Sequence, residues 1–488
     1  MVIESLKYKI LQQFGFAPTQ EQGQALDTFV SFLTDRDPQA VMILRGSAGT
    51  GKTSLSGAIV RTLLQIRQKV MLLAPTGRAA KVFSLGSGAP AYTIHRRIYR
   101  EKAFAGVDGQ FGLNDNLYTD TLFMVDEASM IANMGLGGTT FGSGCLLDDL
   151  VKFVYQGHND RLLLIGDKAQ LPPVGEEESP ALSASVMEGY GLKVYECDLN
   201  EVLRQSQSSG ILYNATLIRQ MITHDAVTGL PLICFKGFAD IVMMPGAELV
   251  ESLGDSYHHV GMDETMVITR SNKRANIYNN GIRNMVLDRE EELSSGDMLM
   301  IVKNNYFWTE KEKRESGEGS AGAVPAFLAN GDRAKVLRVS NYIELYGFRF
   351  ATLLLQLPDY DDYEMQVTGM LDTLQSEAPA LTHEQQEELF RQVEEDYQHF
   401  VPLKADRMKS IRQDAYFNAL QIKYAYAVTC HKAQGGQWAH VYVDQGYMTD
   451  DMLTPDYIHW LYTAFTRATD KLFLVNWPKE QTCEPTDL

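Results

Sequence analysis

The sequence predicts an α/β protein of two domains, each built on a parallel sheet and each carrying a smaller insertion. Three observations support this prediction. The chain has 488 residues, more than the roughly 250 to 300 at which a single hydrophobic core stops growing. Short apolar runs alternate with amphipathic segments through the first half, as in β-α-β units. A second set of such runs begins near Asn200 and resumes only after about Gln421.

Four apolar runs in the first half predict buried parallel strands. They are AVMILRG, KVMLLAP, LFMVDE and RLLLIGD, and each has Gly, Pro or Asp among its last two residues. The segment GKTSLSGAIVRTLLQIRQ, which follows the first run, has helical periodicity. Because β-α-β crossovers are right-handed, the carboxyl ends of these strands meet at one edge of the sheet, and we expect the chemistry there.

An insertion is predicted to interrupt the second sheet. The strands of this sheet are ETMVITRS, AHVYVDQ and KLFLVNW, and the stretch NGDRAKVLRVSNYIELYGFRFATLLLQLP separates the first from the others. Apolar and polar residues alternate in that stretch between Gly and Asn turns, which predicts a small, SH3-like β-barrel. We therefore expect a first domain over 1–200, a second over 201–295 and 421–488, and a barrel with a helical arm over 296–420.

The formal net charge of -18 is concentrated in one segment. Residues 359–400 hold twelve Asp or Glu and one basic residue, Arg391, so the rest of the chain carries only -7. The charge therefore does not exclude a nucleic-acid partner, since phosphate binding depends on local Lys and Arg. The composition, 45% hydrophobic and 22% charged, excludes a fibrous or largely disordered class.

Within the acidic segment, LTHEQQEELFRQVEEDYQHF predicts an amphipathic helix. Thr382 stands where an N-cap is expected, and Gln385 follows three residues later as in a capping box. Leu389, Val393 and Tyr397 then fall on one helical face. We expect a solvated structural arm, and a site for a protein partner is the alternative.

The N-terminus and the cysteines favour an intracellular protein. MVIESLKYKILQQFGF lacks the basic and apolar regions of a signal peptide, and no stretch reaches the roughly 18 apolar residues of a membrane-spanning helix. The five cysteines show no CxxC spacing, so neither a zinc nor an iron-sulfur site is indicated. We expect a cytoplasmic location, reduced thiols and no membrane partner.

The stretch ILRGSAGTGKTSL contains the pattern GxxxxGK[ST] between a predicted strand and a predicted helix, the context that a phosphate-binding loop requires. Its glycines let backbone N–H groups surround the β-phosphate, and the helix N-terminus adds positive potential. Lys52 is expected to reach the β- and γ-phosphates and Thr53 to bind Mg²⁺. The predicted nucleotide-binding residues are Gly46, Ser47, Ala48, Gly49, Thr50, Gly51, Lys52, Thr53 and Ser54.

Two further strand ends supply groups for phosphoryl transfer. In LFMVDEASM, Asp126 is expected to hold Mg²⁺ and Glu127 to orient and deprotonate the attacking water. In LLLIGDKAQLPPVG, Asp167 and Gln170 follow a strand, and the Gln170 amide could sense the γ-phosphate; an ordinary turn is the alternative. With the glycine loop, these residues predict ATP and Mg²⁺ as cofactors.

From Pro18 to Trp477, the chain resembles the superfamily-one helicases, subfamily B, of the RecD and Dda type, relatives of the Pif helicases. The motifs that carry the resemblance, in family order, are PTQEQ, GSAGTGKT, APTGRAAK, TIHRRIY, VDEASM, GDKAQLPPV, LNEVLRQ, TRSNKRANIYNNGIR, AVTCHKAQGGQW and LYTAFTRAT. The resemblance implies two tandem RecA-like domains. It also implies that Gln22 reads adenine and that Gly436 contributes to the nucleotide site.

The resemblance further implies that Arg204 and Arg467 act as arginine fingers. Both lie far from the glycine loop in the sequence, so they complete the γ-phosphate site only when two domains close on ATP. Closure and hydrolysis would then be coupled, and each cycle would step the domains along a nucleic-acid strand.

Strand contacts are expected mostly to phosphate and sugar, because a translocase cannot depend on one base sequence. The candidates are Thr76, Arg78, Lys81, His95, Phe111, Asn272, Thr429, His431, Lys432 and Gln434. Gly435 and Gly436 would allow close approach of the backbone. Ala433 departs from the family, in which Ser is frequent, and it lacks the hydroxyl contact that Ser would offer.

The stretch AFAGVDGQFGL predicts a β-hairpin, within an insertion over about 97–118, because Asp108-Gly109 is a strong two-residue turn signal. The resemblance implies a wedge that parts the duplex, with Phe104 and Phe111 as candidate aromatics; a plain surface hairpin is the alternative. The Gly-rich stretch ANMGLGGTTFGSG after Glu127 predicts a flexible loop without assigned chemistry.

The resemblance implies an ATP-dependent DNA helicase that moves 5′ to 3′ on single-stranded DNA and acts at junctions with duplex DNA, in repair, recombination or replication. We expect a monomer. The alternatives are a motor subunit that needs a nuclease partner, a P-loop kinase or switch, and an acidic scaffold whose ATPase controls binding. The two arginine candidates and HKAQGGQW favour the helicase over the switch.

Overall fold

The computed structural model describes residues 2–105, 108–135, 142–201, 208–223, 229–316, 324–325 and 327–483. The chain divides into two compact units, one formed by residues 1–246 with 433–488 and the other by residues 247–432. The domain bounds expected at 200, 295 and 420 stay predictions.

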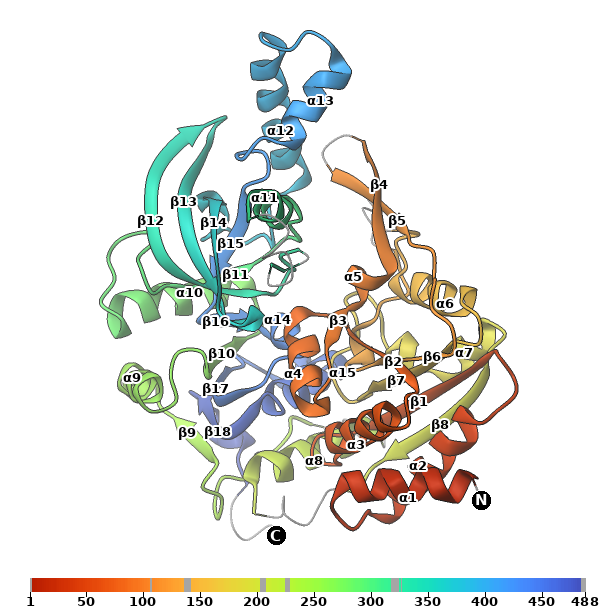
Figure 1. Cartoon of the computed structure of the whole chain (residues 1–488). Coiled ribbons are helices and arrows are strands. Elements are labelled where there is room, and N and C mark those ends of the chain that lie inside the picture. The colour runs from red at the N-terminus through yellow and green to blue at the C-terminus, as the bar shows by residue number, and fades with distance from the viewer. Residues whose placement is uncertain are drawn as a thin grey trace. The chain divides into compact units, whose positions relative to one another are not determined.

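The first unit contains a six-stranded parallel sheet with the order β3-β2-β6-β7-β1-β8 (Figure 1). Its strands are β1 (Ala40–Gly46), β2 (Lys69–Ala74), β3 (Ala91–Thr93), β6 (Thr121–Val125), β7 (Arg161–Gly166) and β8 (Lys193–Leu199). Every residue of β1, β6 and β7 is buried. The four apolar runs of the first half are therefore parallel strands, as predicted; three are buried throughout, and β2 is buried over Leu72–Ala74.

Helices cover both faces of this sheet, because alternate residues of a strand point to opposite sides. Met42 and Leu44 pack in one apolar cluster with side chains of the first group of helices, and Val41 and Ile43 pack in another with the second group. The first group is α1 (Val2–Phe14), α2 (Gln20–Leu33), α3 (Lys52–Gln65) and α4 (Gly77–Ser87). The second group is α5 (Ile94–Ile98), α6 (Leu146–Gln156) and α7 (Ala184–Gly189).

The predicted hairpin is present, with a different turn. Strands β4 (Tyr99–Ala105) and β5 (Asp108–Leu113) pair antiparallel. Asp108 pairs with Ala105 and Gly109 with Phe104, so the prediction of a turn at Asp108-Gly109 is wrong by two residues. Residues 106–107, between the two strands in the chain, lie outside the described residues. The local turn signal placed the hairpin correctly, but cross-strand pairing determined its register.

The first unit also contains the parallel strands β17 (Trp438–Asp444), β18 (Ala468–Val475) and β9 (Ile241–Met244). Helices α8 (Gly210–Thr223) and α15 (Pro455–Phe465) pack against each other in the same unit.

A disulfide joins Cys234 to Cys483, whose Cα atoms lie 4.9 Å apart although 249 positions separate them in the chain. The backbone N–H of Cys483 donates to the Ile233 carbonyl at 2.9 Å. The expectation of reduced thiols is therefore wrong for this pair, because cysteine spacing says nothing about contacts made by distant segments.

The second unit is dominated by a closed five-stranded barrel. Its strands are β11 (Met298–Ile301), β12 (Arg333–Leu345), β13 (Phe348–Leu357), β14 (Tyr363–Met370) and β15 (Leu420–Tyr424). Beside the barrel, β10 (Thr265–Thr269) pairs in parallel with β16 (Ala427–Thr429). The remaining helices of this part are α9 (Leu249–His259), α10 (Asn272–Gly281), α11 (Phe307–Ser316) and α14 (Cys430–Ala433).

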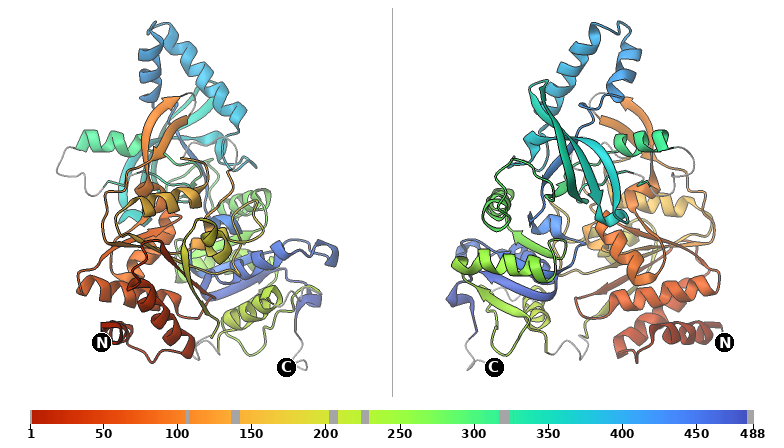
Figure 2. Two further views of the ribbon diagram at one scale, coloured as in Figure 1. Left: turned by 90° about the vertical axis from the view of Figure 1, so that its right-hand side faces the viewer. Right: turned by 60° about the vertical axis from the view of Figure 1, so that its left-hand side comes forward.

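The helical arm consists of α12 (His383–Gln398), which lies in the acidic segment, and the basic helix α13 (Lys404–Arg412), and both extend beyond the barrel strands (Figure 2). Thr382 and Gln385 form the predicted capping box, and Leu389 and Val393 are buried. The predicted α/β class, hairpin and barrel with a helical arm are thus confirmed. Among the described residues, none of the helices has the length and apolarity to cross a bilayer.

Candidate nucleotide and nucleic-acid site

The glycine loop connects β1 to α3 at the carboxyl edge of the sheet. Gly49 and Gly51 adopt φ of 78° and 81°, a left-handed conformation that side chains disfavour. A Cβ atom at Gly46 would lie 2.9 Å from both Lys52 Cγ and Thr50 Oγ1. The loop therefore needs glycine at these three positions, and the motif specifies two of them, Gly46 and Gly51.

The loop directs its polar groups toward one point. Thr53 and Ser54 are exposed in the first turn of α3, where unpaired backbone N–H groups and the helix dipole attract anions. The Lys52 ammonium donates to the Gly46 carbonyl and, at 3.1 Å, to the Ser47 carbonyl. A phosphate group can take the place of these carbonyl acceptors.

Two carboxylates follow β6 at the same edge. The Glu127 N–H donates to Asp126 Oδ1 at 2.9 Å, and Glu127 itself has φ of 52°, a conformation uncommon for a non-glycine residue and frequent at functional sites. Burial, and next the charge of Glu127, raise the pKa of Asp126 to about 7. The Lys52 charge acts on this carboxyl in the opposite direction, so Asp126 lies near the glycine loop. A divalent cation would likewise stabilise the ionised form, and the Asp126 carboxylate and the exposed Thr53 hydroxyl are the oxygen ligands that Mg²⁺ prefers.

Gln170 links the candidate base to the candidate arginine finger. In the amide orientation that satisfies both neighbours, its nitrogen lies 3.3 Å from Glu127 Oε2 and its oxygen 3.2 Å from Arg467 Nη2. Arg467 is only 2% exposed. Its other donors bond to the Thr463 carbonyl, the Gly436 carbonyl and the Thr466 hydroxyl. The structure thus brings together Glu127, Gln170, Arg467 and Gly436, while Arg204 lies outside the described residues.

Tyr462, which the sequence analysis missed, reaches the loop from α15. Its hydroxyl donates to Asp167 Oδ2 at 2.6 Å and accepts the Ala48 N–H at 2.9 Å. Burial, and next the Asp167 charge, raise the pKa of Tyr462 well above its usual value. Tyr462 stands in the motif LYTAFTRAT, from which only Arg467 was assigned a role.

Two more side chains of α15 hold the loop that follows β7. The Leu171 N–H donates to the Thr463 hydroxyl at 2.8 Å, and His459 Nδ1 lies 2.9 Å from the Ala169 carbonyl. Helix α15 therefore contacts both the glycine loop and the segment that carries Gln170.

Gln22 lies at the loop, and both ends of its amide are bonded within the protein; its role in reading adenine stays a prediction. It is 1% exposed; its amide oxygen accepts the Thr19 N–H at 3.0 Å, and its amide nitrogen donates to the Thr50 carbonyl at 2.9 Å. The side chain ties the start of α2 to the glycine loop.

Gln22→Ala is accordingly expected to weaken binding of ATP and GTP by the same factor, because the tether to Thr50 supports the phosphate loop whatever the base. Titrating both nucleotides against the variant and the parent chain gives the two ratios. A loss confined to ATP would support the adenine-reading role that the family resemblance implies.

The strand-contact candidates of the first unit cluster in part. Thr76 caps α4 by accepting the Ala79 N–H, and Arg78 donates to the Gln437 carbonyl at 3.1 Å and lies over the Trp438 ring. A Cβ atom at Gly435, which has φ of 73°, would lie 3.0 Å from Thr76 Oγ1. Two motifs far apart in the sequence therefore meet here.

The other candidates of this unit differ in their surroundings. Lys81 is half-buried. Burial lowers the pKa of His95 to about 4, so the ring is neutral at physiological pH and offers a strand hydrogen bonds but no positive charge. Gln434 is 7% exposed and donates to the Leu171 carbonyl at 2.7 Å, which directs its amide toward the sensor loop.

In the second unit, the candidates lie at the ends of two paired strands. Asn272 begins α10 after β10, and Thr429 ends β16. His431 is exposed, and Lys432 is half-buried; burial lowers the pKa of Lys432. Strand pairing thus gathers Asn272 and Thr429 on one edge of this pair.

The wedge candidates and the Gly-rich loop are only partly described. Phe111 is half-buried and packs against the apolar cluster of its sheet face, whereas the side chain of Phe104 lies outside the described residues. Residues 136–141 of the Gly-rich loop lie outside them as well.

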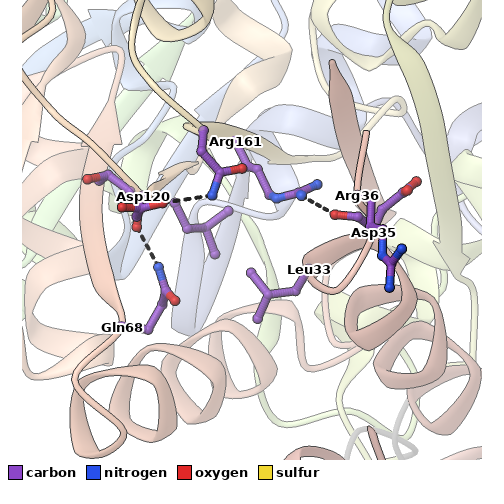
Figure 3. A pocket seen from close by; sticks show the side chains of 9 residues that line it. Leu33, Asp35, Arg36, Gln68, Asp120 and Arg161 are labelled. Carbon is purple, nitrogen blue, oxygen red and sulfur yellow. Dashed lines mark hydrogen bonds between the residues drawn. The ribbon is translucent and has the colours of Figure 1, made fainter. Parts of the chain in front are cut away.

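A pocket of about 560 Å³ lies at the amino ends of β2, β6 and β7, away from the glycine loop. Its polar groups bond to one another: Asn159 donates to Asp120 at 2.7 Å, Gln68 donates to the Asp120 carbonyl at 2.6 Å, and Arg161 donates to the Asp35 carbonyl (Figure 3). These satisfied contacts serve the fold.

Family models match both parts of the nucleotide site. Residues 17–228, which include the glycine loop and both carboxylates, match an AAA domain. Residues 424–475, which include Tyr462 and Arg467, match the UvrD-like helicase C-terminal domain.

One of the similar proteins is named as a DNA helicase. The chain is 30% identical over 157 residues to the ATP-dependent RecD2 DNA helicase of Deinococcus radiodurans, covering 32% of this chain and 18% of that protein. It is 21% identical to uncharacterized protein R530 of Acanthamoeba polyphaga mimivirus, covering 90% of this chain and 96% of that protein. Another curated relative is matched over 13% of its length, so the chain spans less than a fifth of two of its relatives.

Among solved structures, the Bacteroides Pif1 helicase in complex with ADP-AlF3 and ssDNA is 13% identical, with a TM-score of 0.46 and coverage of 96% of this chain and 95% of that chain. The two family models, matched in order within one chain, agree with the motifs that meet at the nucleotide site. Residues 17–228 are therefore similar to AAA domains and residues 424–475 to UvrD-like helicase C-terminal domains, which agrees with the resemblance of the motifs to superfamily-one helicases of the RecD and Pif type.

Proposed function

We propose that this chain is an ATP-dependent DNA helicase that translocates 5′ to 3′ on single-stranded DNA and separates duplexes at junctions. The observation that carries the proposal is the chain of contacts from Glu127 through Gln170 to Arg467, together with the bond from Tyr462, five residues before Arg467, to the glycine loop at Ala48. Lys52 would bind the terminal phosphates, Glu127 would accept a proton from the attacking water, and Gln170 would respond to the γ-phosphate. Bound Mg²⁺, held by Thr53 and Asp126, would neutralise developing charge.

Steady-state ATP hydrolysis with and without a single-stranded DNA oligonucleotide, at low and high salt, tests this function. We expect strong stimulation that fades with salt, because phosphate contacts release counterions. An RNA oligonucleotide of the same sequence tests the choice of nucleic acid, and duplexes with a 5′ or a 3′ tail test polarity. Hydrolysis that is indifferent to the strand would contradict the proposal.

Phe111→Ala tests the wedge. If the hairpin parts the duplex, the variant should keep its single-strand-stimulated hydrolysis and unwind tailed duplex more slowly. Thermal unfolding must be followed in parallel, because Phe111 also packs against an apolar cluster. Equal loss of hydrolysis and unwinding at unchanged stability would argue against the wedge.

A second candidate is a motor subunit that needs a protein partner. Phe400 and Leu403, between α12 and α13, are 78% and 67% exposed at the end of the helical arm. Large apolar side chains that are exposed between an acidic and a basic helix favour a protein contact. If the chain alone hydrolyses ATP but does not unwind, this candidate gains support. A monomeric state and a cytoplasmic location stay predictions.

A further inference from the structure

Arg219 of α8 lies at the glycine loop, although no motif points to it. Its Nη1 donates to the Ser47 hydroxyl at 2.7 Å. The same guanidinium lies 3.5 Å from the Asn200 carbonyl, and the side chain is half-buried. Both described partners of Arg219 are neutral oxygens.

The charge of Arg219 is not neutralised by the part of the chain that the structure describes. Among the described residues, no carboxylate lies within ion-pair distance of the Arg219 guanidinium. Arg45 of β1, by contrast, pairs with Asp198 at 2.6 Å and with Glu196 at 2.8 Å. A half-buried guanidinium without a counterion is costly. An anion bound at the loop would supply the missing charge.

Two cationic side chains, Lys52 and Arg219, donate hydrogen bonds to Ser47. The Lys52 ammonium donates to its carbonyl at 3.1 Å, and Arg219 donates to its hydroxyl. Lysine in this loop position serves the β- and γ-phosphates, so Arg219 lies at the terminal-phosphate end of the loop. Its planar, forked donors suit phosphate oxygens.

Helix α8, which carries Arg219, is positioned by its packing against α15. Tyr462 of α15 accepts the N–H of Ala48, the residue next to Ser47. Two adjacent loop residues are therefore contacted from one helix pair. We propose that Arg219 is a phosphate-binding residue of the nucleotide site, which exchanges the Ser47 hydroxyl for the terminal phosphates of ATP. This inference rests on the proposed function for the identity of the nucleotide.

Calorimetric titration of Mg-ATP and Mg-ADP into the full chain without DNA tests the role of Arg219. Because a hydrogen bond to a charged group contributes about 1.5 to 3 kcal/mol, Arg219→Ala should weaken ATP binding by roughly 10- to 100-fold. ADP binding should suffer less, and Arg219→Lys, which keeps a point charge, should fall between. The control is Arg314→Ala on α11, since Arg314 is 60% exposed and pairs with Glu310.

Ser47→Ala separates phosphate binding from support of the loop. If Arg219 acted only through the Ser47 hydroxyl, the two single variants would show the same loss and the double variant would add nothing. Such equal, non-additive losses would overturn the inference. It would also be overturned if Arg219→Ala kept the ATP affinity of the parent chain, or if that variant lost the same factor in affinity for ATP and for ADP. A parent chain that binds ATP tightly but is not stimulated by DNA would contradict the proposed helicase function and leave the Arg219 result readable.

Discussion

Lys52→Ala is expected to remove detectable ATP hydrolysis and to weaken ATP binding. The ammonium already donates to two loop carbonyls, at Gly46 and Ser47, so it lies where incoming phosphate oxygens compete for it. Losing one preorganised donor costs about 10²- to 10³-fold in turnover, and here a full positive charge is lost as well. Hydrolysis is measured as phosphate release with saturating single-stranded DNA.

The matched control for this variant is Lys152→Ala on α6. Lys152 is 56% exposed and pairs with Asp148 at 2.5 Å, a surface pair that contributes little. The Lys152→Ala variant should hydrolyse ATP at the same rate as the parent chain. Full activity of Lys52→Ala would rule out the glycine loop as the catalytic phosphate site.

Arg467→Ala is expected to lower turnover by roughly 10³-fold or more, the range of an arginine finger. Its guanidinium is buried and lies 3.2 Å from Gln170. The substitution would remove the positive charge and leave the Gln170 amide without one of its partners. Single-turnover hydrolysis separates this effect from nucleotide binding, which should change much less.

Arg467→Lys is the informative companion. Lysine keeps the charge but cannot reproduce the bonds to Thr463, Gly436 and Thr466, so turnover should stay low while the fold is kept. Thermal unfolding without nucleotide checks that the fold is intact. A change of only a few-fold in Arg467→Ala would assign this arginine a structural role.

The sequence predicted those parts of the site that are encoded locally. The glycine loop needs positive φ at Gly49 and Gly51. Glycine at these positions can be recognised within one short segment of the sequence. Asp126 and Gln170 follow buried strands, so their place at the sheet edge follows from strand direction. The capping box at Thr382 is equally local, and it was found at the expected residues.

The missed features depend on contacts between distant segments. Arg219 and Tyr462 reach Ser47 and Ala48 from helices far along the chain, and helical periodicity does not distinguish these side chains from their neighbours. The Cys234 disulfide and the commitment of Gln22 to Thr50 were hidden for the same reason. Tertiary packing, which the local sequence does not encode, places these groups.

The hydroxyl of Tyr462 has one proton, and that proton is directed at Asp167. Its raised pKa means that the proton stays on at any physiological pH, so its lone pair always faces the Ala48 amide. The Ala48 amide is thus held in a fixed direction by a side chain and not only by the backbone of the loop. Phosphate would meet a rigid receptor, and little of its binding energy would be spent on ordering the peptide backbone.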